Sequence, residues 1–156
     1  MSLSDWSVFV TAALVNPVMY AVLRFRGARG ATGLVQRWSA QRLDARRRPV
    51  TQETIRAAKT ISAWVNRGAA WPMPTVTCLA RSLTGQLLLQ RRGIETSLRI
   101  GVRPAAAGEP GASGGLLFHA WIEVDGVPVN DVLDVGDRFL AFPSDEGLDA
   151  IVGAGA

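Results

Sequence analysis

The hydrophobic pattern of the chain changes once, near residue 94, and this change limits the possible fold more than any other feature. After it, residues 95–102 alternate between apolar and polar, and residues 117–123 and 127–133 also read as strands. Helices followed by strands predict an α+β fold with a small antiparallel sheet. Before the change, apolar residues recur at helical spacing, beginning with Val8, Leu14, Val18 and Val22.

The length of 156 residues and the 48% of hydrophobic residues suffice for one packed core. We expect a helical N-terminal segment at residues 1–48, where Pro17 predicts a break or kink and the glycines at 27–33 predict a turn. The basic run that ends at Pro49 marks a boundary. The remaining residues, 49–156, are expected to form the core domain.

The chain has one cysteine, which excludes an internal disulfide and a zinc site built on several cysteines. We expect neither a metal nor a cofactor. A free thiol and a start without a basic cluster favour the cytoplasm over secretion. The apolar stretch at residues 8–25 is interrupted by Thr11, Asn16 and Pro17, so we expect a buried or partner-facing helix and no membrane span.

Charge is distributed unevenly along the chain. Residues 1–94 hold 14 Lys and Arg against 3 Asp and Glu, whereas residues 95–156 hold 3 against 10. The basic half could dock an acidic partner, or the arginines could simply solvate helix faces. Aromatic residues interleaved with arginine are sparse outside Trp38, so we expect no nucleic-acid partner.

The only cysteine, Cys78, is predicted to lie in the first turn of a helix. A helix at residues 51–67, with Thr51 as its N-cap, precedes a proline-containing approach at 71–77. An apolar stripe then continues to Gly93, which is suited to end the helix. A helix N-terminus lowers the pKa of a thiol, and its free N–H groups can stabilise an oxyanion. Cys78 is therefore a candidate nucleophile.

His119 is the only histidine and hence the only candidate for the base that a thiol needs. A turn signal at residues 124–126 predicts that its strand pairs with the strand at 127–133. A two-residue turn would place His119 opposite Val132. We instead expect a three-residue turn with a bulge at Gly126, which places His119 opposite Asp131.

The same register would pair two further sets of apolar residues around the histidine, and in it Asp131 would orient the imidazole as the third member of a triad. Asp134 and Asp137 are alternative acids, which we expect to be solvated or to cap. Glu123 is expected to be peripheral. The apolar pairs are Leu117 with Leu133 and Trp121 with Val129.

Several segments resemble the leader peptidases of lasso peptide biosynthesis, over roughly residues 60 to 135. The resemblance implies a transglutaminase-like, papain-related fold with Cys78, His119 and Asp131 as the triad. It also implies removal of the leader from a ribosomally made precursor, before a separate cyclase closes the macrolactam. The segments are Cys78–Leu83, Leu89–Gly93, Ile100–Val102, Phe118–Gly126 and Asn130–Asp131.

In that family the short stand-alone peptidase works with a small leader-binding protein, the RiPP recognition element. The expected partners are therefore this protein, the precursor peptide and the cyclase. The backbone N–H of Cys78 and the side chain of Trp71 are candidates for the oxyanion hole. Because thioester chemistry is shared, the same triad would also serve a transglutaminase or an arylamine acetyltransferase. A non-catalytic basic binding module is the third alternative.

Overall fold

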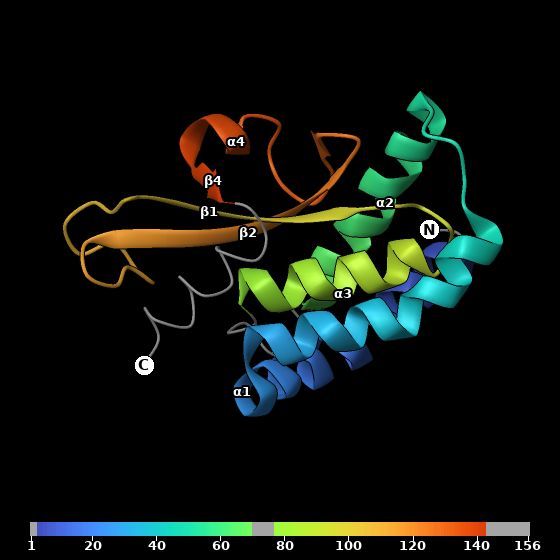
Figure 1. Cartoon of the computed structure of the whole chain (residues 1–156), viewed down its shortest axis with the longest axis horizontal. Helices are drawn as coiled ribbons and strands as arrows, with labels where there is room; N and C mark the ends of the chain where they lie inside the picture. Colours follow the sequence, from blue (N-terminus) through green and yellow to red (C-terminus); the bar gives the residue numbers. More distant parts are fainter. Residues whose placement is uncertain (1–2, 70–76, 143–156) are drawn as a thin grey trace.

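The computed structural model describes residues 3–69 and 77–142, and within them a helical layer packs against a small sheet (Figure 1). Trp71 lies outside the described residues. The elements in chain order are α1 (Leu3–Arg46), α2 (Gln52–Ala69), α3 (Cys78–Gln90), β1 (Ser97–Pro104), β2 (Leu116–Val124), β3 (Val127–Pro128), α4 (Val135–Arg138) and β4 (Leu140–Phe142).

Helix α1 consists of two arms that fold back on each other at Gly27. The chain stays helical through Pro17, so the break predicted there is wrong. The turn predicted at residues 27–33 is confirmed at Gly27, whose φ of 68° and ψ of 178° are non-helical. Gly30 and Gly33 lie within the second arm. A left-handed φ is accessible to glycine at little cost, which explains why the chain turns there.

By length and composition alone, the Trp6–Ala40 part of α1 could cross a membrane. In the structure this part is divided at Gly27, and both arms bury residues against the remainder of the chain. Met19 of the first arm and Ala31 and Val35 of the second belong to the main hydrophobic cluster.

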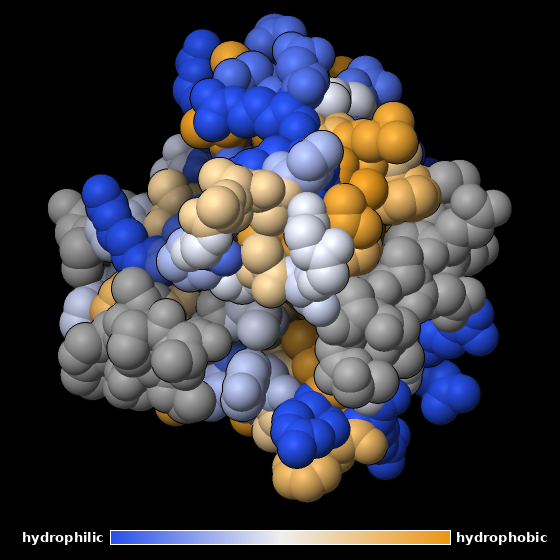
Figure 2. Space-filling view, turned by 90° about the vertical axis from the view of Figure 1, so that its left-hand side faces the viewer, coloured by the Kyte–Doolittle hydropathy of each residue, from blue (hydrophilic) through white to orange (hydrophobic). Residues whose placement is uncertain are grey.

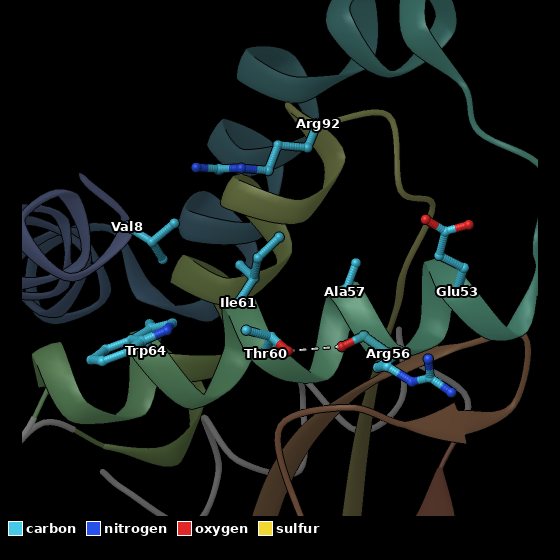
Figure 3. Close-up of a pocket in the computed structure, with 8 residues that line it drawn as sticks. All are labelled: Val8, Glu53, Arg56, Ala57, Thr60, Ile61, Trp64 and Arg92. Atoms are coloured by element: carbon cyan, nitrogen blue, oxygen red, sulfur yellow. Dashed lines mark hydrogen bonds between the residues drawn. The ribbon is translucent and has the colours of Figure 1, made fainter. Parts of the chain in front are cut away.

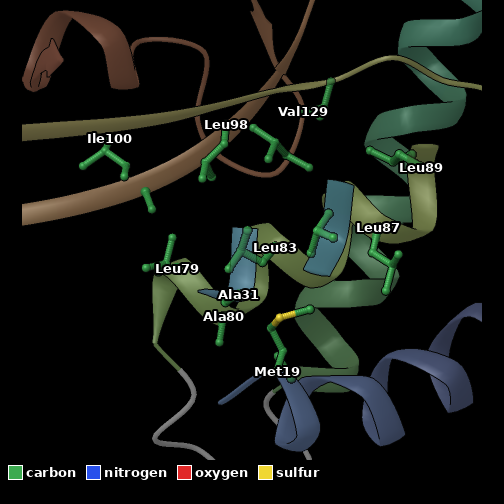
Figure 4. Packing of buried hydrophobic residues seen from close by; sticks show 14 of the residues in the cluster. Met19, Ala31, Leu79, Ala80, Leu83, Leu87, Leu89, Leu98, Ile100 and Val129 are labelled. Carbon is green, nitrogen blue, oxygen red and sulfur yellow. The ribbon is translucent and has the colours of Figure 1, made fainter. Parts of the chain in front are cut away.

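Helix α3 lies between α1 and the sheet and carries the centre of the core (Figures 1 and 4). Leu83 and Leu89 are fully buried, and the cluster continues into Leu98 and Ile100 of β1. Helix α2 adds Ala58 to this cluster, and its Val65 packs in a second cluster with Val8, Ala12 and Leu88. Because α1, α2 and the sheet all pack against α3, the position of the N-terminus of α3 is fixed.

Both ends of α3 are capped. The hydroxyl of Thr77 accepts a hydrogen bond from the Ala80 N–H at 3.3 Å. At the other end Gly93 has a φ of 79°, and the Ile94 N–H donates to the Leu89 carbonyl, a Schellman arrangement. The predicted helix start at Cys78 is therefore confirmed.

The sheet has the order β3-β2-β1-β4 and is antiparallel throughout. The expected register of the hairpin is wrong. Val124 pairs with Val127, so the turn has two residues, Asp125 and Gly126, with φ of 50° and 75°. These positive angles are those of a type I′ turn, which matches the twist of the flanking strands better than the bulged turn that we expected.

The predicted strand at 127–133 is also too long, because β3 ends at Pro128. The expected apolar pairs with Leu133 and Val129 therefore do not form, and Leu133 is exposed. Trp121 instead packs with Val135 and Phe139. Helix α4, which was not predicted, packs on this face of the sheet, and the unpredicted strand β4 extends the sheet beside β1.

Candidate active site

The candidate site lies where the N-terminus of α3 meets the open edge of β2. In the part of the chain that the structure describes, no strand neighbours this edge beyond the two residues of β3. The hydroxyl of Ser82, one turn after Cys78, donates to the Ala120 carbonyl at 2.9 Å. The backbone N–H of Ala120 is in turn hydrogen-bonded to the Cys78 thiol. The nucleophile candidate is thus attached directly to the strand that carries His119.

The structure brings the three predicted site residues together. The side chains of Cys78 and His119 are hydrogen-bonded. His119 Nε2 lies 2.5 Å from Asp131 Oδ2, and both side chains are about one quarter exposed. Because Nε2 is occupied by the carboxylate, Nδ1 is the ring nitrogen left for the thiol. The arrangement has the order nucleophile, base and orienting acid.

Asp131 reaches His119 although the register that suggested the contact is wrong. The chain leaves the ladder after Pro128 and turns, so that Asp131 is no longer placed by the alternation of a strand. The Asp131 Oδ1 atom accepts from the Val132 N–H at 2.8 Å, which fixes the carboxylate locally. The pair was therefore predicted correctly from an incorrect geometry.

The three groups shift one another's pKa toward their charged forms. Burial alone would raise the pKa of the Cys78 thiol. The hydrogen bond and charge of His119, the Ala120 N–H and the charge of Arg81 outweigh burial, so this pKa is lowered. Burial alone would lower the pKa of His119, but hydrogen bonds to Asp131 and Cys78 raise it to about 9.

Burial likewise opposes ionisation of Asp131, yet the hydrogen bond from His119 and that of the Val132 N–H lower its pKa. Together these shifts favour the thiolate, the imidazolium and the carboxylate over the neutral forms. A thiolate is the nucleophilic form of cysteine. In this ionised form the site can attack a carbonyl carbon without first transferring a proton.

The backbone of α3 supplies hydrogen-bond donors beside the thiol. Cys78 and Leu79 are the first two residues of the helix, and their N–H groups have no intrahelical acceptor. Such donors at a helix N-terminus can stabilise negative charge on an oxygen. The second oxyanion-hole candidate, Trp71, lies outside the described residues, so its role stays a prediction.

The alternative acids lie elsewhere. Glu123 accepts from Trp121 Nε1 at 2.8 Å and pairs with Arg99 at 3.0 Å. Asp134 precedes α4 and pairs with Arg138. Among the described carboxylates, only Asp131 has a recorded hydrogen bond to His119.

Aromatic rings define one side of the histidine. The centroid of the Phe139 ring lies 5.1 Å from that of His119, and Trp121 stacks at 6.2 Å with an interplanar angle of 21°. Gly101 pairs with His119 across the sheet, and a Cβ there would lie 2.8 Å from the Phe139 Cβ. A glycine at this position therefore allows Phe139 to close over the strand.

Two features of the site were missed by the sequence analysis. Arg81, one turn after Cys78, contributes a positive charge that favours ionisation of both Cys78 and Asp131. Asn130 bonds to Ser82 and to the Ile122 N–H. The spacing of Arg81 on the predicted helix could have identified it, whereas no pattern in the sequence reveals the contacts of Asn130.

A groove of about 480 Å³ lies at the other end of α3, between α2 and the first arm of α1 (Figure 3). It contains no member of the triad. Trp64 and Ile61 form an apolar wall, and Arg92 extends its guanidinium along the rim. Among the described residues, no group of three or more histidine, cysteine or acidic side chains could hold a metal ion.

Comparison with known proteins identifies one family. The family model described as "Transglutaminase-like superfamily" matches residues 19–142. The match begins within the first arm of α1 and ends with β4, so it includes Cys78, His119 and Asp131. No curated protein and no solved structure matches the chain.

Proposed function

Since the chain belongs to the transglutaminase-like superfamily, we propose that it is a cysteine peptidase that removes the leader from a lasso peptide precursor. The observation that carries this proposal is the hydrogen-bonded series Cys78, His119 and Asp131 at the N-terminus of α3. The residue segments that resemble lasso leader peptidases support the substrate class. Three of these segments contain Cys78, His119 and Asp131.

The proposed reaction follows from the charged state of the site. The Cys78 thiolate attacks the scissile carbonyl, and the N–H groups of Cys78 and Leu79 stabilise the resulting oxyanion. The His119 imidazolium then donates its proton to the leaving amine of the core peptide. This step leaves the leader attached to Cys78 as a thioester.

Water completes the cycle. The neutral imidazole of His119 removes a proton from water, which attacks the thioester carbonyl and releases the leader as a carboxylic acid that loses its proton to solvent. The thiolate and the imidazolium are regenerated together. Asp131 keeps the imidazole oriented and stabilises its charge throughout.

A second candidate function differs only in the last step. If an amine attacked the thioester in place of water, the chain would be an acyl transferase of the transglutaminase or acetyltransferase type. The triad is compatible with both outcomes because it determines the intermediate and not the acceptor. A non-catalytic binding module would not need Cys78.

A leader-binding protein is the proposed partner, with the cyclase acting afterwards on the released core. The first arm of α1 offers a surface for that protein. Trp6, Val10, Leu14 and Val18 are all exposed and recur at a spacing of four residues along this arm. No charged residue occurs between Trp6 and Arg24. Exposed apolar surface of this kind typically marks an interaction site.

Charge at the end of the same arm suggests the chemistry of the partner surface. Arg24 and Arg26 are exposed on either side of Phe25, which is 85% exposed. Figure 2 shows the end of the molecule where α1 turns, and on it hydrophobic surface lies directly beside hydrophilic side chains. We therefore propose that the partner presents an apolar face bordered by acidic residues.

Co-precipitation with the leader-binding protein tests this surface. Leu14→Asp should abolish binding without unfolding the protein, because Leu14 is 68% exposed. Leu140→Asp on β4 is the matched control, since Leu140 is 72% exposed and belongs to another surface. Equal binding by both variants would contradict the assignment.

The function itself is tested by incubating the protein and its Cys78→Ala variant with a lasso-type precursor and the leader-binding protein, and following peptide mass. Separation into leader and core only with Cys78 present is the expected result. An added mass on an amine acceptor would instead identify a transferase. No change with either protein, although the leader-binding protein is bound, would support the binding-module alternative.

A further inference from the structure

The edge of β2 beside the site contains buried backbone groups that a neighbouring strand would ordinarily satisfy. Ala120 and Ile122 are almost completely buried, and their N–H and C=O groups face away from β1. The Val129 N–H still donates to the Ile122 carbonyl at 3.0 Å, but beyond it side chains take the place of a strand. A buried backbone group without a partner is costly, so these replacements are structurally demanding.

Asn130 replaces one of these strand hydrogen bonds directly and supports a second through Ser82. Its Oδ1 accepts from the Ile122 N–H at 2.8 Å, and its Nδ2 donates to the Ser82 hydroxyl at 3.0 Å. The Ser82 hydroxyl donates onward to the Ala120 carbonyl at 2.9 Å. The Asn130 carbonyl accepts from Asn66 Nδ2 at 3.0 Å. We call these contacts of Asn66, Ser82, Ala120, Ile122 and Asn130 the Asn130 network.

Each member of the triad is covalently close to the Asn130 network. Asp131 directly follows Asn130, and His119 directly precedes Ala120. Cys78 lies one helical turn before Ser82 on α3. The network therefore connects the helix of the nucleophile, the strand of the base and the loop of the acid.

We propose that Asn130 is the positioning residue of the Cys78–His119–Asp131 site. It draws the chain off the hairpin ladder at the point where Asp131 must turn toward His119. It also fixes the distance between α3 and β2, across which Cys78 and His119 meet. The inference rests on the proposed function only in treating these three residues as the reacting groups.

Position 130 requires both the oxygen and the NH2 group of an amide side chain, because one accepts from Ile122 and the other donates to Ser82. Aspartate would keep the acceptor for the Ile122 N–H but could not donate to Ser82, and it would place a second carboxylate beside Asp131. Leucine has a similar size but neither donor nor acceptor. If Asn130 only filled space, its replacement by leucine would be tolerated.

NMR titration of His119 tests the proposal independently of any substrate, because the chain has a single histidine. The wild-type imidazole should titrate near pH 9. Asn130→Ala and Asn130→Leu should shift this pKa downward toward the ordinary value of about 6.5, since Asp131 would no longer be held against the ring. With precursor, kcat should fall about 100-fold while KM changes little.

Gln90→Ala is the matched control for loss of a buried polar contact. Gln90 bonds to Ser39 and to the Thr96 carbonyl at the other end of α3. The Gln90→Ala substitution should lower the melting temperature without changing the pKa of His119. Ser82→Ala provides a second probe of the network if the Asn130 variants do not fold, and it should also lower the His119 pKa.

An Asn130 or Ser82 variant that melts like Gln90→Ala but keeps the wild-type His119 titration would overturn the proposal, because the network would then be merely structural. Combining Ser82→Ala with Asn130→Ala should lower the pKa no further than one substitution alone. If the wild-type protein cleaves no precursor, the proposed function fails, whereas the titration still decides the role of Asn130.

Discussion

At the scale of single residues, His119 determines how the site behaves with pH. It lies between a thiol and a carboxylate, and both raise its pKa against the effect of burial, to about 9. The same contact lowers the pKa of Cys78. The reactive pair therefore exists between the pKa of the thiol and that of the imidazole.

Peptidase activity should accordingly follow a bell-shaped pH profile. Activity should rise as the thiol ionises, below the usual thiol pKa of about 8.5, and fall near pH 9 as the imidazolium loses its proton. Both apparent values belong to the pair. Measurement of kcat/KM against pH checks this, and a profile that is flat from about pH 5 to 9 would count against the mechanism.

Replacing the acid should affect the same profile. Asp131→Asn removes the largest contribution that raises the His119 pKa. We expect the alkaline limb to move to lower pH and kcat to fall about 10²- to 10⁴-fold. Asp134→Asn is the control, because Asp134 pairs with Arg138 and does not contact His119. Equal activity of both variants would exclude Asp131 from the site.

The sequence predicted which side chains come together better than the geometry by which they do so. Cys78 and His119 are each the only residue of their type, so the choice needed no structure. Asp131 was chosen with a hairpin register that the structure contradicts. The contact forms because Asn130 replaces a strand, and such a side-chain substitution leaves no periodic signal in the sequence.

At the scale of elements, the end of α3 depends on a close approach between two segments. A Cβ at Gly93 would lie 1.8 Å from the Arg46 carbonyl oxygen, and the φ of 79° already disfavours other residues. The Arg48 N–H donates to the Gly93 carbonyl at 2.8 Å. The end of α1 is therefore attached to the C-terminus of the helix that carries Cys78.

Gly93→Ala should destabilise the fold by more than about 2 kcal/mol, because a backbone clash adds to the cost of a left-handed alanine. Gly126→Ala is a matched control: its φ is 75°, but no atom lies within 4 Å of a Cβ there. It should cost only about 1–2 kcal/mol. Urea unfolding measures both values, and equal losses would contradict the close approach.

Helices α2 and α3 and strands β1 and β2 could be predicted because each has a clear apolar period and a recognisable end. The shorter elements could not. Helix α4 has four residues and β4 has three. Packing of Val135 and Phe139 on Trp121 holds α4, and pairing with β1 holds β4. Only the apolar run at 139–142 hints at these elements.

At the scale of the whole molecule, α1 contributes to the same hydrophobic core as the sheet. Met19, Ala31 and Val35 pack in the cluster that contains Leu83 and Ile100. The division into residues 1–48 and 49–156 stays a prediction. The sequence could not reveal this packing, because both arms reach the core only when the chain folds back on itself at Gly27.

Removal of residues 1–48 should leave a chain that does not fold cooperatively, because the remaining part of the cluster would be exposed to water. Circular dichroism and thermal unfolding of residues 49–156 check this. A sharp transition near that of the full chain would show that α1 is dispensable for the core and serves the partner alone.

The central claim is that His119 holds Cys78 as a thiolate. Because the chain has one cysteine, the rate of its alkylation by iodoacetamide as a function of pH reports this residue alone. We predict that the wild-type thiol ionises below the usual value of about 8.5 and that His119→Ala raises its pKa, because burial then opposes ionisation with less compensation. A wild-type thiol that titrates at its usual value, unchanged by His119→Ala, would contradict the account.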